Sequence, residues 1–260
     1  MRPMLNTLIA TLLALGLISQ IQAQDSKNRQ EPQHASDDSA ARAVIDKAIQ
    51  ATGGEEKLEP LKSQTWMEKG MFYGLTPNGL PYGAKMAIEW PDKARMEFIG
   101  FMTIVLNGDR GWTDQRGTVT AMPKDQLDEQ KGQQYCGHVT MLLPLKDKNF
   151  TLSLLGDSTV DSQAATGVQV SHKGHRDVKL YFDKKTGLLS KSEWQVKSQE
   201  QDGKEVKQEI WYQNYKAMNG IQVPMKIVMK HDSKPYVEAE IFNVKLGAKI
   251  DPKLFEKPGK

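Results

Sequence analysis

The chain has almost no cysteine and no catalytic signature. Its 260 residues include one cysteine, Cys136, which excludes an internal disulfide and any C-x-x-C zinc or redox motif. The formal net charge is only +3, and basic residues form no cluster longer than pairs such as Lys184-Lys185. A nucleic-acid partner is not expected, because phosphate-binding proteins concentrate their cations on one stripe. No G-x-S-x-G, H-E-x-x-H or phosphate-binding glycine loop occurs, so we expect no cofactor and no metal ion.

Long apolar runs are also scarce, apart from one at the start. Residues 8–18 are apolar except for a threonine and a glycine, and Arg2 precedes them. This run is too short to span a bilayer and has the form of a secretory signal. We predict that residues 1–23 are a signal peptide cut between Ala23 and Gln24. The protein would then be exported, either periplasmic or secreted.

A polar segment separates this signal from the first patterned element. Residues 24–39 show no apolar period and are predicted to be a disordered linker. Asp38 or Ser39 is expected to cap a helix that ends at Gly53-Gly54. One face of this helix is apolar and must lie on something larger. That face carries Ala41, Val44, Ile45, Ala48 and Ile49.

Most of the remaining chain alternates apolar and polar residues with a period of two. The pattern is clear at residues 85–90, 94–98, 177–182 and 237–242. Turn signals such as Asn219-Gly220 separate the segments, and about ten or eleven strands are expected by this rule. A sheet with one apolar and one charged face is typically antiparallel and exposed to solvent on one side. Such a long sheet must curl. We therefore predict a mainly β domain over residues 40–260, a strongly curved antiparallel sheet forming an incomplete barrel covered by two or more helices.

One further helix is predicted over residues 123–143, between Pro123 and the stop at Pro144. Gly132 and Gly137 weaken it by about 1 kcal/mol each relative to alanine, so a mobile or broken helix is expected. We expect it to act as a lid over the sheet. Its apolar stripe consists of Leu127, Tyr135, Val139 and Leu142.

Methionines and other apolar residues of the strands are candidates for the wall of a ligand cavity. Methionine is flexible and polarisable, so it suits a wall that adapts to variable chains. The alternative is that these side chains only fill an irregular core. The cavity candidates are Met67, Met71, Met86, Ile88, Met96, Phe98, Leu180, Phe182 and Met229.

Two blocks of the chain carry a resemblance to a known family. Residues 177–193 form a strand, a tight turn and a return strand, and residues 212–224 form a strand, an Asn-Gly turn and a strand closed by Pro224. With the signal peptide and the amphipathic helix, these blocks make the chain similar to periplasmic lipoprotein carriers of the LolA/LolB type. The resemblance implies a LolA-like half-barrel whose inside holds acyl chains.

The resemblance also implies a function. It points to a non-catalytic envelope protein that binds a lipid or the acyl chains of a lipoprotein, as a lipoprotein-sorting carrier does. The expected partners are a lipid or a lipidated protein and an envelope membrane protein, and the expected state is a monomer. Two alternatives stay open. One is a secreted hydrolase that uses His172, His175 and Asp177, and the other is a periplasmic sensor that binds a partner protein through the same groove.

Overall fold

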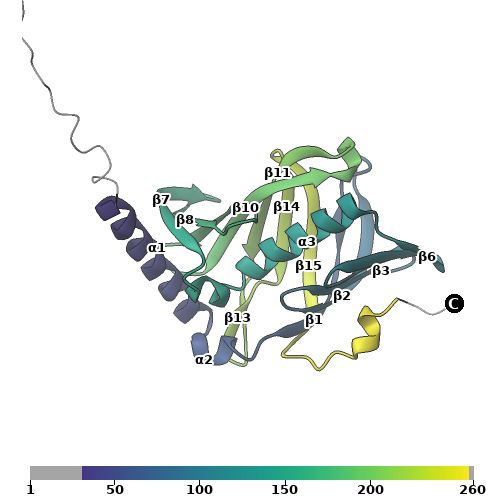
Figure 1. Cartoon of the computed structure of the whole chain (residues 1–260), viewed down its shortest axis with the longest axis horizontal. Helices are drawn as coiled ribbons and strands as arrows, with labels where there is room; N and C mark the ends of the chain where they lie inside the picture. The colour runs from purple at the N-terminus through teal and green to yellow at the C-terminus, as the bar shows by residue number, and fades with distance from the viewer. Residues whose placement is uncertain (1–30, 258–260) are drawn as a thin grey trace, which may run out of the picture.

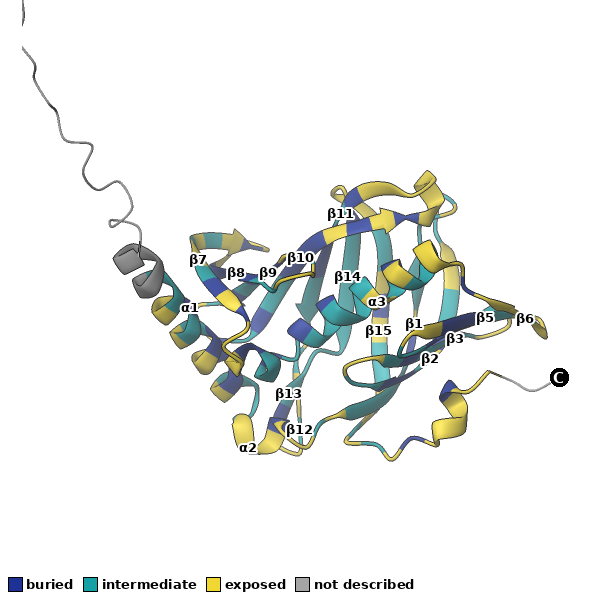
Figure 2. Ribbon diagram, in the orientation of Figure 1, coloured by how far each residue is buried: buried dark blue, intermediate teal, exposed yellow. Residues whose placement is uncertain are grey.

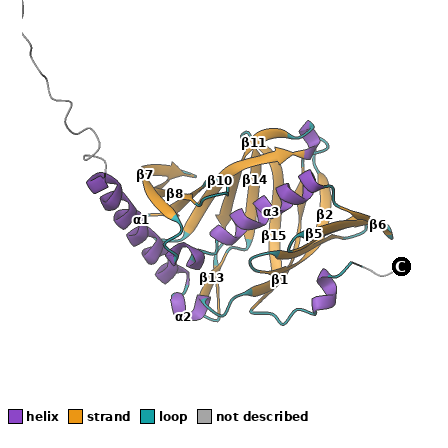
Figure 3. Cartoon of the chain, in the orientation of Figure 1, coloured by secondary structure: helices purple, strands orange, loops and turns teal. Residues whose placement is uncertain are grey.

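The computed structural model describes residues 31–257, and almost half of them belong to one large antiparallel sheet (Figures 1 and 3). Thirteen strands lie in the order β6-β5-β4-β3-β2-β1-β15-β14-β11-β10-β9-β8-β7, and β12 pairs with β13 in a separate hairpin. The strands are β1 (Ser63–Phe72), β2 (Leu80–Glu89), β3 (Lys93–Phe98), β4 (Met102–Asn107), β5 (Arg110–Gln115), β6 (Thr118–Ala121), β7 (Thr151–Val160), β8 (Gln163–Ser171), β9 (Val178–Asp183), β10 (Leu189–Ser198), β11 (Lys204–Gln213), β12 (Lys216–Met218), β13 (Ile221–Val223), β14 (Lys226–His231) and β15 (Lys234–Leu246).

Helices of two kinds accompany the strands. Those found between residues 31 and 257 are α1 (Glu31–Thr52), α2 (Glu55–Leu58), α3 (Lys124–Val139) and the short 3₁₀ helices η1 (Leu143–Lys146), η2 (Gln199–Gln201) and η3 (Pro252–Phe255). The predicted fold class is confirmed: the sheet is antiparallel, open at β6 and β7, and accompanied by more than two helices. The strands are more numerous than predicted, because short ones such as β6, β12 and β13 hold too few residues for alternation to show. The predicted signal peptide, residues 1–23 with the cut between Ala23 and Gln24, lies outside the described residues.

The sheet consists of two meanders joined by the C-terminal hairpin. Strands β1 to β6 run from the centre to one edge, and β7 to β11 run from the other edge back toward the centre. The hairpin of β14 and β15 fills the middle, pairing with β11 on one side and with β1 on the other. The two edge strands, β6 and β7, are therefore consecutive in the sequence. The chain between them must cross the whole sheet.

Helix α3 makes this crossing (Figure 1). Its 16 residues span about 24 Å at 1.5 Å per residue, a length that bridges the two sides of the curled sheet. We call the face of the sheet that α3 crosses the inner face and the opposite one the outer face. The position of α3 is thus a consequence of the strand order.

Bulges and one glycine bend the sheet. The register shifts once in each of the pairs β1–β15, β14–β15, β9–β10 and β7–β8. Such bulges increase local twist and bending. At Gly70 the strands β1 and β15 approach so closely that a Cβ would lie 1.8 Å from the carbonyl oxygen of Glu238. Only glycine fits there, so this position helps to set the curvature.

Helix α1 seals one half of the inner face. It packs mainly along β7, with further contacts to β8 and β13. The predicted apolar stripe is buried as expected, except that Val44 is half-buried. The helix ends at Gly53 and Gly54, which have positive φ, and the N–H of Gly54 donates to the carbonyl of Ile49 at 2.9 Å. The prediction that Gly53-Gly54 ends this helix is confirmed.

The predicted start of this helix is wrong. Helix α1 begins at Glu31, so residues 31–39 of the predicted linker 24–39 are helical. Asp38 does not cap the helix. Its carboxylate accepts the backbone N–H of Leu152 in β7 at 3.1 Å and the Nε–H of Arg42 at 2.7 Å. A residue that resembles a cap in the sequence instead fastens the helix to the sheet edge, a contact that no local pattern reveals.

The C-terminal segment covers part of the outer face. Ile250 and Phe255 are buried there against Ala87, Val105 and Trp112. Asn107 holds the segment in place by donating from its side-chain amide to the carbonyl of Phe255 at 3.0 Å. The outer face of β2, β4 and β5 is therefore closed by the last turn of the chain. Figure 2 shows this buried patch beside the otherwise exposed 3₁₀ helix.

Candidate ligand-binding site

The strand register divides the predicted cavity residues between the two faces of the sheet. Met86 pairs with Met96, and both point to the inner face together with Ile88 and Phe98. Leu180, Phe182 and Met229 also belong to the inner face, as the register traced through β15, β14, β11, β10 and β9 shows. Met67 pairs with Lys85, and Met71 pairs with Pro81. These two methionines therefore lie on the outer face and cannot share a cavity with the other seven.

Met67 belongs to a different hollow. It lines an outer-face pocket of about 610 Å³ beside Lys85, Arg95 and Leu254. The side-chain amide of Asn243 donates to the Met67 sulfur at 3.5 Å. Lys85 and Arg95 give this pocket a charged rim on the outer face of the sheet. The assignment of Met67 and Met71 to the ligand cavity is corrected accordingly.

The inner face is filled over β7 to β10. Leu180 and Phe182 are fully buried in the core cluster formed with α1 and η1. Side chains of Ile45, Ile49 and Leu145 occupy the space above them. No ligand can reach these two predicted residues without displacing α1. They are core residues, which is the alternative that the sequence left open.

The inner face stays accessible over the middle of the sheet and the first meander. Ile88, Ala94 and Leu106 are buried there near Leu127 of α3, but other apolar side chains of this face remain half-buried (Figure 2). We call these half-buried side chains the open floor. Its members are Met86, Met96, Phe98, Ile104, Ile227, Met229, Val237 and Ile241. They come from β2, β3, β4, β14 and β15, so the open floor extends across several strands. It lies on the face of the sheet that α3 crosses.

One carboxylate interrupts this apolar surface. Glu68 of β1 pairs with Ala84 and Ile241 on the inner face and is only 9% exposed. The indole Nε1–H of Trp66 donates to its Oε2 at 3.1 Å, and the hydroxyl of Tyr82 donates to its Oε1 at 2.9 Å. Burial and the adjacent Glu68 carboxylate raise the pKa of Tyr82 far above its usual range, so its hydroxyl stays a donor. Glu68 was not expected from the sequence, because no periodic pattern marks a lone acid within a strand.

Helix α3 is continuous, so of the two expectations, a mobile or a broken helix, the broken one is wrong and the mobile one stays a prediction. It runs over Lys124–Val139 and ends earlier than the predicted 123–143. A Cβ at Gly132 would lie 2.6 Å from the guanidinium of Arg176, and one at Gly137 would lie 3.1 Å from the ring of Trp90. Both glycines therefore admit a large side chain against the helix backbone.

Arg176 fastens α3 to the second meander. Its Nη1 and Nη2 donate to the two carboxylate oxygens of Glu129 at 3.0 and 2.9 Å, and its Nη1 also donates to the carbonyl of Gln195 at 2.6 Å. Glu129 is only 6% exposed, and its hydrogen bond raises the pKa of Arg176 further. A bidentate contact of this kind is strong and directional. The sequence analysis missed both residues, since their partners are far apart in the chain.

The predicted lid stripe is partly confirmed in position. Leu127, Tyr135 and Val139 lie on α3 and contact the sheet clusters. Leu142 is buried but lies beyond the helix, with a positive φ of 66° before η1. Cys136 was not placed in the stripe, yet it is fully buried under α3, and burial raises the pKa of its thiol to about 12. Burial therefore favours the protonated form of this lone thiol.

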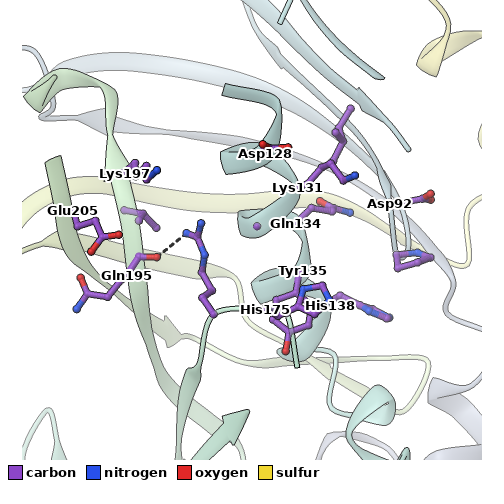
Figure 4. A pocket seen from close by; sticks show the side chains of 16 residues that line it. Asp92, Asp128, Lys131, Gln134, Tyr135, His138, His175, Gln195, Lys197 and Glu205 are labelled. Atoms are coloured by element: carbon purple, nitrogen blue, oxygen red, sulfur yellow. Dashed lines mark hydrogen bonds between the residues drawn. The ribbon is translucent and has the colours of Figure 1, made fainter. Parts of the chain in front are cut away.

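A pocket of about 580 Å³ lies beside α3, between the helix and the ends of β10 and β11 (Figure 4). Tyr135 and His175 stack there with ring centroids 4.0 Å apart, and His138 of the same helix lines the pocket nearby. Charged side chains such as Asp128 and Lys197 also line it. A mixed polar wall of this kind suits water better than an acyl chain.

The structure does not assemble the predicted hydrolase cluster. His172 and His175 stack on each other with ring centroids 4.9 Å apart. Asp177 instead accepts the side-chain amide of Gln169 at 3.0 Å. Burial lowers the pKa of His175, and the neighbouring His172 lowers it further. No group of three or more metal-ligating side chains occurs among the residues described.

Comparisons with known proteins identify the fold. No family model matches the chain, and no curated protein matches it by sequence. A LolA superfamily protein from Nitrosomonas europaea superposes with a TM-score of 0.56 at 14% identity, covering 84% of this chain and 97% of that one. A DUF1329 family protein from Desulfovibrio piger gives 0.52 at 11% identity over 83% and 97%. An outer membrane lipoprotein-sorting protein domain from Vibrio parahaemolyticus gives 0.50 at 11% identity over 81% and 97%.

The fold is therefore LolA-like, a curved antiparallel sheet left open as a half-barrel with helices on its inner side. The resemblance inferred from the two hairpin blocks is confirmed at this level. Identities of 11 to 14% establish the architecture alone. The ligand and the task must be argued from the site itself.

Proposed function

We propose that this protein is a non-catalytic envelope protein that binds one apolar chain, from a lipid or from the acyl group of a lipoprotein, on the open floor. The observation that carries the proposal is a group of eight half-buried apolar side chains on one face that neither α1 nor η3 covers. About ten methylenes buried on such a surface gain roughly 8 kcal/mol before the costs of association. A chain of more than ten carbons is therefore the expected ligand.

The composition of the floor supports a variable ligand. Met86, Met96 and Met229 supply flexible, polarisable side chains that can adjust to chains of different length. The Vibrio parahaemolyticus neighbour is described as a lipoprotein-sorting domain, which supports lipoprotein acyl chains as one candidate cargo. The hydrolase alternative has less support, because His172 and His175 stack on each other and Asp177 accepts a hydrogen bond from Gln169.

The proposal places the protein outside the cytoplasm. Residues 1–23 carry the features of a signal peptide, and the residue after the predicted cut is Gln24 and not a cysteine. None of the helices within residues 31–257 is long and apolar enough to cross a membrane. A released envelope protein meets acyl chains at membrane surfaces, where a carrier takes up or delivers its cargo.

Two substitutions test the binding site. Met96→Asp puts a charge on the open floor, whereas Met67→Asp puts the same charge on the outer face of β1, two strands away in the sheet. We expect Met96→Asp to weaken the uptake of a fluorescent fatty-acid probe at least about tenfold, because the charge must lose water when the chain covers it. Met67→Asp should bind as the wild type does.

Thermal melts of both variants control for unfolding. The proposal fails if a stably folded Met96→Asp protein takes up the probe as well as the wild type. If the wild type binds no acyl probe and instead retains a partner protein whose release depends on the open floor, the sensor alternative is favoured.

A further inference from the structure

Glu68 differs from the other buried glutamates of the protein. Glu129, Glu193 and Glu209 are also almost fully buried, and each has a cation at 2.7 to 3.1 Å: Arg176 for Glu129 and Lys191 for the other two. Within residues 31–257, Glu68 forms no ion pair. Its two recorded partners are the neutral donors on Trp66 and Tyr82. Its negative charge is hydrogen-bonded but not balanced.

Burial of this unbalanced charge lowers the stability of the fold. A carboxylate removed from water loses several kcal/mol of hydration, and neutral hydrogen bonds return only part of it. Replacement of a buried charge by an apolar residue is often neutral or stabilising. The surrounding surface would accept such a residue, because Glu68 lies between Ala84 and Ile241. The charge is therefore better explained by a ligand than by stability.

Aromatic rings frame the carboxylate. Trp66 lies two residues before Glu68 on the same face of β1, and Tyr82 lies on the adjacent strand. The ring of Phe98 stands 6.0 Å from that of Tyr82, tilted by 51°. The faces of such rings attract cations. Among the other inner-face side chains of β1 to β4, β11, β14 and β15, the charged ones are Lys204 and Lys234, which are exposed at the first positions of β11 and β15. Burial lowers the pKa of His231 on the same face.

We infer that Glu68, Trp66, Tyr82 and Phe98 form a subsite for a cationic head group, an amine or quaternary ammonium, of the amphiphile whose chain lies on the open floor. This inference rests on the proposed function and adds the class of head group to it. The open floor continues directly from the subsite, because Phe98 belongs to both and Ile241 pairs with Glu68. A single-chain amphiphile can thus place its charge at Glu68 and its chain along the methionines.

An anionic head group does not fit this subsite. The donors of Trp66 and Tyr82 already point at Glu68, so they are not free for a phosphate or a carboxylate. The nearby lysine Lys85 lies on the outer face, where it pairs with Glu97 at 3.0 Å. A second negative charge beside Glu68 would be repelled at low dielectric.

The experiment compares amphiphiles that differ only in their heads. Dodecyltrimethylammonium, dodecanoate and monododecanoylglycerol, each below its micelle concentration, would displace N-phenyl-1-naphthylamine from the wild type, from Glu68→Gln and from Glu240→Gln. Glu240→Gln removes the same charge from an exposed position of the outer face. We expect the wild type and Glu240→Gln to prefer the ammonium head over the carboxylate at least tenfold. Glu68→Gln should lose this preference while it still binds the neutral ligand.

The outcomes separate the two proposals. If the wild type binds dodecanoate as tightly as the ammonium compound, or if folded Glu68→Gln keeps the preference, the subsite is wrong while chain binding stands. If none of the three amphiphiles displaces the dye, the proposed function fails as well. The wild-type ranking decides the question even if Glu68→Gln does not fold, and a thermal melt establishes its folding.

Discussion

Gly132 and Gly137 let large side chains pack against the backbone of α3. Glycine in a helix interior costs about 1 kcal/mol relative to alanine, so the two would weaken α3 in isolation. Here the guanidinium of Arg176 occupies the site of a Cβ at Gly132, and the indole of Trp90 would be in tight contact with a Cβ at Gly137. The contact between Arg176 and the buried Glu129 depends on this close approach. The packing of Arg176 and Trp90 against α3 thus compensates the low helix propensity of the two glycines.

We predict that the effect of Gly132→Ala on stability changes sign with its neighbour. In the wild type the new methyl group displaces Arg176 from Glu129, so the free energy of unfolding should fall by about 1 to 3 kcal/mol. In an Arg176→Ala background the space is empty, and the same change should raise the free energy of unfolding by about 1 kcal/mol through helix propensity. Urea unfolding of the four proteins measures both values.

Gln133→Ala provides the control on the same helix. It removes no hydrogen bond recorded in the structure, so it should shift stability by less than about 0.5 kcal/mol in either background. A stabilising Gly132→Ala in both backgrounds would mean that Arg176 does not occupy the helix surface in solution.

At the scale of elements, α3 connects the two edges of the sheet and rests on few buried side chains. Only Glu129, Cys136 and Val139 of the helix are buried, while most of its other residues stay half-buried or exposed. Strand β9, in contrast, alternates fully buried Val178, Leu180 and Phe182. Elements with few buried contacts open at lower free energy than the core strands. The local stability of α3 should therefore be below that of the sheet.

We predict faster amide exchange in α3 than in β9, and a change in α3 when a ligand binds. The helix lies over the inner face, so an acyl chain on the open floor alters the surface on which it packs. Hydrogen exchange measured with and without dodecyltrimethylammonium and a long-chain fatty acid would show the difference. Protection equal to that of Val178–Asp183 and unaffected by either ligand would make α3 a fixed brace and not a lid.

For the whole molecule, one continuous sheet serves two purposes. The half over β7 to β10 is sealed by α1 and forms the largest core cluster. The other half carries smaller clusters and leaves the open floor accessible. The sealed half supplies the burial that stabilises the fold. Under the proposed function, the open half would exchange its ligand without unfolding this core.

We predict that the exported protein starts at Gln24 or within a few residues of it. The apolar run of residues 8–18 and the small Ala23 favour a cut at this point. N-terminal sequencing of the protein purified from the cell envelope would measure it. As a matched control, Leu13→Arg breaks the apolar run and should leave the uncleaved chain inside the cell. An intact Met1 on a membrane-bound protein would contradict the prediction.

Local patterns in the sequence determined the fold class. Alternation with a period of two predicted the strands, turn residues such as Asn219-Gly220 predicted the hairpins, and Gly53-Gly54 marked the end of α1. These features depend on neighbours along the chain, which is why a single sequence reveals them. The curled, open sheet followed because a long one-sided sheet cannot stay flat.

Only the tertiary structure decided which residues form the site. Alternation shows that Met67 and Met86 each take one face of their strand, but the pairing register between strands decides whether the two faces agree. The early start of α1 at Glu31, the pairing of Arg176 with α3 and the isolation of Glu68 all depend on residues distant in the chain. Contacts of this kind form only when the strands pair in their native register. The free energy that selects them comes from burial and from pairing across strands, and not from local propensity.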